Sequence, residues 1–413
     1  MARPFDPRYE GGYLNDRDSS SDWTDEREAA RAYYQLARKR IGLLDPGLMA
    51  SQCHVLSGIY LMYTLDPLKS WLEFHQAGSM YFLYLKAQAV IEEPSGVTST
   101  LMQPHRRLEQ RLYWTILKSE CEFRVQLDLA QSDLCKLDYP YLFPSPPTPE
   151  SPAESPYEIR NKDTSASPST AGSSRVLSQA SSPISREAEQ QTWFYYLSEI
   201  AVRRIENRML NAFYKKNFEN WSPKSLRSMI RAAEEIEAQL ETWHSSLPDV
   251  LRVQDLDADQ AMDELRYVTH GRILSLRSML YRPFVYYAIH HGDEAHHSGE
   301  NDAQRLQDFV TKALNICVEM SNGHAMTYRH HGTWYGLRER LAASMTLLGA
   351  GIAGLITLGN IRQSASDGEQ IHGNPYRQAI LLCIEQLRYW EAEAPADVGR
   401  ARELLANFIT SIG

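Results

Sequence analysis

A serine- and proline-rich run at residues 144–189 separates two long stretches in which apolar residues recur every three to four positions. That spacing predicts amphipathic helices on both sides of the run. The run itself holds too few apolar residues to bury the surface that would offset the entropy cost of ordering it. No alternation of apolar and polar residues is long enough to predict a strand. The sequence therefore predicts an all-α protein interrupted by a disordered insertion.

Four segments follow from this pattern. Residues 1–22 form a polar leader that lacks the apolar core of a signal peptide. Residues 23–143 form a first helical half, residues 144–189 the disordered linker, and residues 190–413 a second helical half. We expect the two halves to belong to one domain and to share one core.

Proline and capping residues predict where several helices begin. Asp45-Pro46, Asp66-Pro67 and Asn374-Pro375 each pair a capping side chain with a proline at the first helical position. In the first helix, apolar residues recur at helical spacing, at Ala29, Tyr33, Leu36 or Ala37, and Ile41. The expected helices cover 21–41, 46–64, 67–90, 104–127, 191–218, 224–245, 260–290, 302–321, 335–359, 376–391 and 397–412.

Composition narrows the class of protein. The net charge of −9 argues against a broad basic face that binds nucleic acid. The five cysteines are dispersed and form no C-x-x-C pair, so neither a zinc knuckle nor a disulfide framework is expected. Residues 341–361 are uncharged and long enough to span a bilayer. Their glycines and hydroxyl residues, and the lack of flanking aromatic residues, favour a buried helix and no membrane association.

The segment 265–290 combines arginines, aromatic residues and histidines. One stripe of it is apolar, and its arginines are spread around the remaining surface instead of sharing one face, as a nucleic-acid contact would require. This pattern predicts a core helix with snorkelling or ion-paired arginines. Pro283 predicts a kink near residues 279–282. The stripe comprises Leu265, Val268, Ile273, Leu276 and Leu280, and the arginines are Arg266, Arg272, Arg277 and Arg282.

The histidines raise the question of a metal site. Two E-x-x-H spacings occur, Glu241 with His244 and Glu294 with His297, and such pairs help to build di-iron centres in helical bundles. However, no pair of glutamates projects from two other apolar helix faces, and Glu294 is expected in a loop. Glycine-rich phosphate loops, nucleophile elbows and H-E-x-x-H are also missing. We therefore assign no catalytic, cofactor-binding or metal-ligating residue and expect no enzyme.

Three stretches together resemble the regulatory domain of fungal zinc-cluster transcription factors. They are the helices in "GLMASQCHVLSGIYLMYTLDPLKSWLEFHQAGSMYFLYL", the helix "RRLEQRLYWTILKSECEFRVQLDL" with Arg111, Tyr113 and Trp114, and the segment "YRPFVYYAI". The chain departs from the family in two ways. The Gly-Arg-Pro that often follows the tryptophan helix is replaced by "LDLAQSDLCKLDYP". No six-cysteine zinc cluster precedes Cys53, and such a cluster is the family's DNA-reading module.

The resemblance implies a regulatory role in the nucleus, in transcription by RNA polymerase II. Zinc is expected only in the missing N-terminal cluster, so DNA would be reached indirectly, through a missing module or a partner. The chain would then be a fragment or a paralogue that lost its cluster. Expected partners are the transcription machinery or co-regulator proteins, and a small-molecule effector is compatible with the role. An all-α enzyme and a non-switching adaptor stay open as alternatives.

Overall fold

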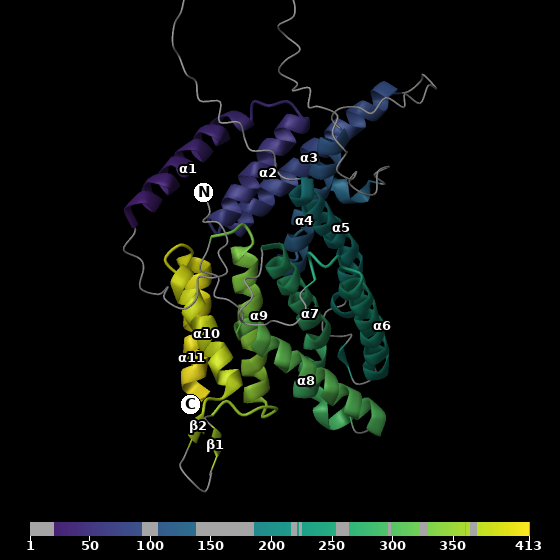
Figure 1. Cartoon of the computed structure of the whole chain (residues 1–413), viewed down its shortest axis with the longest axis vertical. Coiled ribbons are helices and arrows are strands. Elements are labelled where there is room, and N and C mark those ends of the chain that lie inside the picture. The colour runs from purple at the N-terminus through teal and green to yellow at the C-terminus, as the bar shows by residue number, and fades with distance from the viewer. Residues whose placement is uncertain are drawn as a thin grey trace, which may run out of the picture.

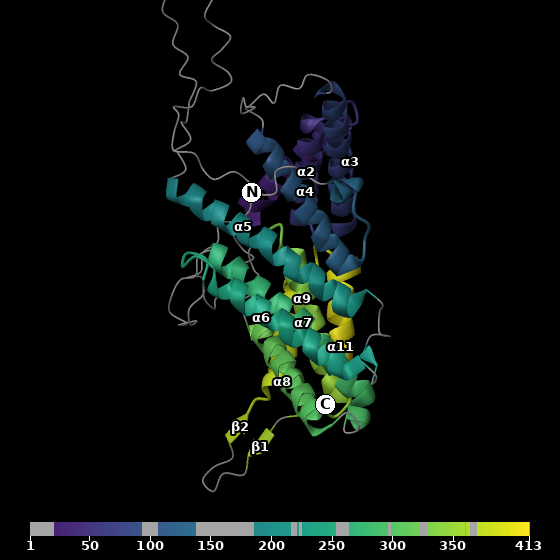
Figure 2. The ribbon, with the colours of Figure 1, turned by 90° about the vertical axis from the view of Figure 1, so that its right-hand side faces the viewer.

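The computed structural model is a helical protein in which long helices pack side by side (Figures 1 and 2). The structure describes residues 20–92, 106–137, 186–215, 221–222, 225–252, 264–295, 299–322, 329–359, 361–363 and 370–412. Within them, the all-α prediction is confirmed. One short antiparallel hairpin is added, in which β1 (Ile361–Gln363) pairs with β2 (Gln370–His372). None of the described helices is long and apolar enough to cross a membrane.

The described helices follow the predicted order with shifted ends. In the first half they are α1 (Ser20–Ile41), α2 (Leu48–Tyr63), α3 (Pro67–Glu92), α4 (Arg106–Leu127) and the short 3₁₀ turn η1 (Asp133–Lys136). In the second half they are α5 (Arg186–Met209), the π-turn η2 (Leu210–Tyr214), α6 (Leu226–Ser245), α7 (Glu264–Ala295), α8 (Glu300–Asn322), α9 (Thr333–Ile352), α10 (Pro375–Trp390), the π-turn η6 (Pro395–Gly399) and α11 (Arg400–Ile412).

Two predicted segment boundaries need correction. Helix α1 begins at Ser20, so the last three residues of the predicted leader are helical. Helix α5 begins at Arg186, so residues 186–189 belong to a helix and not to the linker. Residues 1–19 of the leader and 138–185, which hold most of the linker, lie outside the described residues.

The hydrophobic core contains residues from both halves of the chain. A single cluster of buried side chains runs from Val55 to Ile409. Phe123 of α4 lies 6.1 Å from Phe74 of α3 and 5.8 Å from Tyr335 of α9, measured between ring centroids. Segments on either side of the serine-rich run therefore pack against each other directly.

Helix α7 lies at the centre of this core. Between Ile273 and Tyr287 its side chains are buried on nearly all sides, so the helix buries more than the predicted stripe. The predicted kink at 279–282 is wrong in its position, because the only non-helical backbone angles within α7 fall at His291. The helix also continues to Ala295, so Glu294 is helical and not in a loop.

Helix α9 ends earlier than predicted. It stops at Ile352 because Gly354 takes a positive φ of 76°, a conformation that glycine adopts without strain. The amide of Leu355 then bonds to the carbonyl of Ala350, which closes the helix end. A Cβ atom at Gly351 would come within 2.3 Å of Leu358, so this glycine permits close packing of the loop that follows.

The apolar stripe predicted for α1 does not face the core. Tyr33 is 75% exposed and Leu36 is 46% exposed. The helix contacts the rest of the protein mainly through its neighbouring face, where Tyr34 stacks on Tyr60 of α2 with ring centroids 4.3 Å apart. Aromatic stacking thus decides which face of α1 is turned inward.

Candidate functional site

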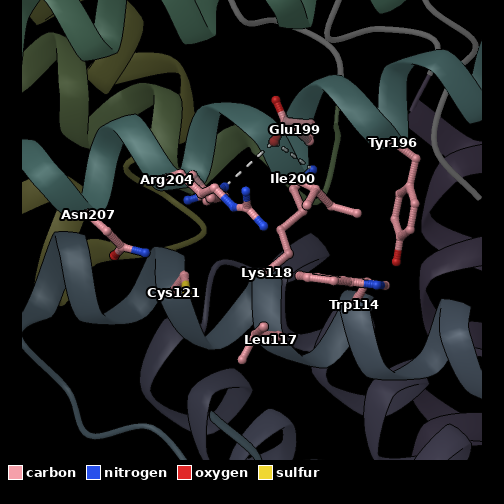
Figure 3. A pocket seen from close by; sticks show the side chains of 10 residues that line it. Trp114, Leu117, Lys118, Cys121, Tyr196, Glu199, Ile200, Arg204 and Asn207 are labelled. Atoms are coloured by element: carbon pink, nitrogen blue, oxygen red, sulfur yellow. Dashed lines mark ion pairs between the residues drawn. The ribbon is translucent and has the colours of Figure 1, made fainter. Parts of the chain in front are cut away.

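A pocket of about 140 Å³ lies between α4 and α5 (Figure 3). Helix α4 contributes Trp114, Leu117, Lys118 and Cys121. Helix α5 contributes Tyr196, Glu199, Ile200, Arg203, Arg204 and Asn207. Long side chains from both helices bridge the space between the two backbones.

Helical periodicity places these side chains on facing surfaces. Trp114, Lys118 and Cys121 are spaced by four and three residues along α4, which aligns them on one face. Tyr196, Ile200 and Arg203 repeat the same spacing along α5. Figure 3 shows the ring of Tyr196 near Trp114 at one end of the pocket, and Cys121, Arg204 and Asn207 at the other. The pocket therefore has an aromatic end and a polar end.

Arg203 is the centre of a buried ion network that forms one wall of the pocket. Its guanidinium contacts Glu122 of α4, and it lies 2.7 Å from Glu206 and 3.6 Å from Glu199 within α5. Glu199 in turn lies 3.1 Å from Lys118, a pair drawn as a dashed line in Figure 3. Because Arg203 is only 8% exposed and Glu206 only 1%, these charges depend on one another for stabilisation.

The network extends from the pocket into the centre of the fold through α7. Arg272 lies 3.1 Å from Glu206 and 3.5 Å from Glu122. One turn further along α7, the Ser275 hydroxyl donates a hydrogen bond of 2.5 Å to the half-buried Glu339 of α9. Ion pairs thus connect the pocket wall to α7, and a separate hydrogen bond joins α7 to α9.

The pKa values of the network follow from burial and from the paired charges. Burial would raise the pKa of Glu122, but the Arg203 and Arg272 guanidinium groups lower it to about 2. Burial likewise opposes ionisation of Lys118, yet the Glu199 carboxylate raises its pKa. Burial raises the pKa of Glu339 to about 7, and the hydrogen bond from Ser275 and the charges of Arg272 and Arg282 only partly oppose this rise. The ion network is therefore charged at neutral pH, whereas the Glu339 carboxyl group titrates close to neutral pH.

The remaining titratable groups that line the pocket have pKa values displaced from neutrality. Burial raises the pKa of Tyr196 to about 12. It also raises the pKa of the Cys121 thiol, which accepts a hydrogen bond from Gln131. General acid–base catalysis at pH 7 works best with a group that titrates near that pH. The lining groups instead hold fixed charges and fixed hydrogen-bond donors, an arrangement suited to binding.

Those histidines of the sequence motifs that the structure describes do not gather into one site. Glu241 contacts Arg277, and His244 lies in the last turn of α6. His297, the partner expected for Glu294, lies outside the described residues. Among the residues that the structure does describe, no three His, Cys, Asp or Glu side chains are grouped to hold a metal ion.

The rings of the adjacent histidines 330 and 331 lie near α9 with centroids 3.9 Å apart and planes tilted by 44°. Desolvation and the neighbouring His330 lower the pKa of His331 below its ordinary value of 6.5. Tyr63 of α2 lies 6.2 Å from the ring of His331. Both histidines therefore contact a tyrosine of the first half, although His331 stays exposed to solvent.

Neither the pocket nor its ion network was predicted from the sequence. Glu199, Arg203 and Glu206 stand four and three residues apart, and this alternation of charge is common on solvent-exposed helices. What distinguishes it is that Arg272, on a helix otherwise apolar in this region, joins the same network. No family model, curated protein sequence or solved structure matches this chain.

Proposed function

We propose that this chain is the regulatory domain of a fungal transcription factor, and that it acts in the nucleus on transcription by RNA polymerase II. In this proposal it carries no DNA-reading module of its own and reaches DNA through a missing or partner module. Its protein partners are co-regulators or the transcription machinery. A small molecule bound between α4 and α5 sets its output.

One observation carries this proposal: the pocket shares a wall with an ion network that continues into the core. Arg203 lines the pocket and contacts Glu206, which also contacts Arg272 of the central helix α7. A ligand that changes the charge or packing beside Arg203 would act on α7 through these contacts. A change in the balance between two arrangements of the core is the general basis of ligand-dependent regulation.

Two further points support a regulatory role. Trp114, one of the residues on which the family resemblance rests, lines this pocket. The pKa values of the lining residues favour binding over catalysis, as argued above. Zinc has no role in this proposal within the chain itself.

The proposal is tested by fusing the full chain to an unrelated DNA-binding module and measuring a reporter gene controlled by that module's sites. We expect the fusion to change reporter output relative to the module alone at equal nuclear protein levels. Ile200→Trp fills the pocket and should alter that output, whereas Leu381→Trp on the exposed side of α10 should not. A fusion that behaves like the module alone contradicts the regulatory role.

A further inference from the structure

Helix α1 turns an apolar face to solvent. Tyr33 is 75% exposed and Leu36 is 46% exposed, and Ala29 and Ala32 beside them are exposed as well. Helical periodicity places these four residues on the side of α1 away from Tyr34, through which the helix packs against α2. Figure 1 shows α1 at one edge of the molecule. A contiguous exposed apolar face is typical of a protein–protein contact.

Two charged side chains without partners flank this face. Glu28 and Lys39 are both exposed. They are separated by about three helical turns, so they lie on the same side of α1. Neither side chain forms an ion pair or a hydrogen bond with any residue that the structure describes. The apolar face is therefore bordered by an unpaired negative charge toward one end and an unpaired positive charge toward the other.

A second copy of α1 is complementary to this face when the two helices run antiparallel. A two-fold axis that passes between Tyr33 and Leu36 sets each Tyr33 against the partner's Leu36. The same axis brings Glu28 beside the partner's Lys39, and symmetry repeats this pair at the other end of the contact. A parallel arrangement would instead set like charges against each other, which is unfavourable.

We propose that α1 is a dimerisation surface, at which two copies of this chain pair through antiparallel α1 helices. Burial of Tyr33 and Leu36 supplies most of the affinity, and the Glu28–Lys39 pairs select the antiparallel orientation. Each copy contributes one helix, so the interface belongs to the small and transient class. A dimer is compatible with the proposed function but does not depend on it, because the contact lies on α1 and not at the pocket between α4 and α5.

Sedimentation equilibrium of the full chain tests whether the dimer exists. We expect a reversible equilibrium between monomer and dimer with a dissociation constant on the order of 10 µM, as for other small interfaces. A chain that stays monomeric at about twenty times that concentration would overturn the proposal, since a contact of this strength would then be largely saturated.

A variant of the apolar face locates the contact. Leu36→Glu places a charge in the centre of the interface and should leave the chain monomeric over the same concentration range. Leu381→Glu is the matched control, because Leu381 is 43% exposed on α10, and it should dimerise like the unmodified chain. Circular dichroism and thermal unfolding establish that both variants are folded. Unchanged dimerisation of a folded Leu36→Glu variant would contradict the assignment to α1.

Charge reversal distinguishes the antiparallel arrangement from any other dimer. Glu28→Lys and Lys39→Glu should each weaken dimerisation by roughly ten-fold, because each replaces two symmetry-related ion pairs with like-charge contacts. The double variant restores opposite charges across the interface and should dimerise within about two-fold of the unmodified chain. Within one helix the two residues are about 16 Å apart, so this recovery requires pairing between copies. A double variant weaker than either single variant would refute the antiparallel pairing.

Discussion

The hydroxyl group of Tyr214 donates a hydrogen bond of 2.6 Å to the backbone carbonyl of Met279. In an uninterrupted helix this carbonyl would accept a bond from the amide of residue 283, but Pro283 has no amide hydrogen. Tyr214, at the end of the π-turn η2, therefore supplies the donor that the proline removes. This contact helps to explain why α7 passes through Pro283 with helical backbone angles.

We expect Tyr214→Phe to lower the free energy of unfolding by roughly 1–3 kcal/mol, because it leaves a buried carbonyl without its donor. The loss should be smaller in a Pro283→Ala background, where the alanine amide can bond to Met279. Urea unfolding of the four proteins in this double-mutant cycle measures the coupling. An identical loss in both backgrounds would show that the hydroxyl does not substitute for the missing amide.

Leu276 tests the position of α7 in the core. Its side chain is completely buried, and truncating it to alanine should cost roughly 2–5 kcal/mol through lost apolar burial and the cavity that remains. The matched control is Leu381→Ala, at a leucine that is 43% exposed on α10. Chemical denaturation should give a midpoint shift for the first variant and almost none for the second. Comparable stability of both variants would show that the Leu276 face of α7 does not lie in the core.

Titration of the Glu339 carboxyl group should lower the free energy of unfolding as the pH rises. Burial raises its pKa from an ordinary value of 4.5 to about 7, so between these values the folded state binds more protons than the unfolded state. Its favourable contribution is therefore complete below pH 4.5 and is lost as the pH rises through 7. The loss amounts to roughly 3 kcal/mol at pH 8, since one pKa unit corresponds to about 1.4 kcal/mol.

Glu339→Gln removes this titration, so the variant should gain stability relative to the unmodified chain between pH 5 and pH 8. Glu403→Gln on α11 is the control, because the Glu403 side chain is 67% exposed. Thermal unfolding across this pH range reads out both. A constant difference between Glu339→Gln and the unmodified chain would mean that the carboxyl group does not titrate there.

Asn374 caps α10 and also fastens the preceding loop. Its side-chain oxygen accepts bonds from the amides of Tyr376 and Arg377, and its Nδ2 group donates to the carbonyls of Thr357 and Gly359. Loss of a cap alone costs roughly 0.5–2 kcal/mol. We expect Asn374→Ala to lower the free energy of unfolding by more than that range. The stability of Asn374→Asp, which keeps the acceptor, should lie between those of Asn374→Ala and the native chain. An Asn374→Asp variant as stable as the native chain in thermal unfolding would deny the loop a role.

Short-range signals in the sequence predicted much of the fold. Asn374-Pro375 and Asp66-Pro67 mark real helix starts, because a cap and a proline act within one turn. Asp45-Pro46 does not, since α2 begins at Leu48 after Gly47. Asp302, expected at a helix start, lies in the first turn of α8 and pairs with Arg227 at 3.0 Å.

The site was beyond the reach of the sequence because it depends on distance in space. Trp114 and Arg203 are far apart along the chain, and each occurs in a helix whose charges look solvent-exposed. Arg272 shows the difficulty most clearly. It was expected at the surface or in an ion pair; the structure confirms the ion pair but buries it between three helices. Only the packing of α7 against α5 reveals which arginine is buried.

The order of charges along α5 also determines how that helix can dock. Glu199, Arg203 and Glu206 meet Lys118, Glu122 and Arg272, each beside an opposite charge. A shift of one helical turn, about 5.4 Å, would bring Arg203 to the position of Glu199 and set it against Lys118. Apolar side chains alone would tolerate such a slip far better. The buried ion pairs thus favour a single register of α5 against its neighbouring helices, whatever they contribute to the net stability of the fold.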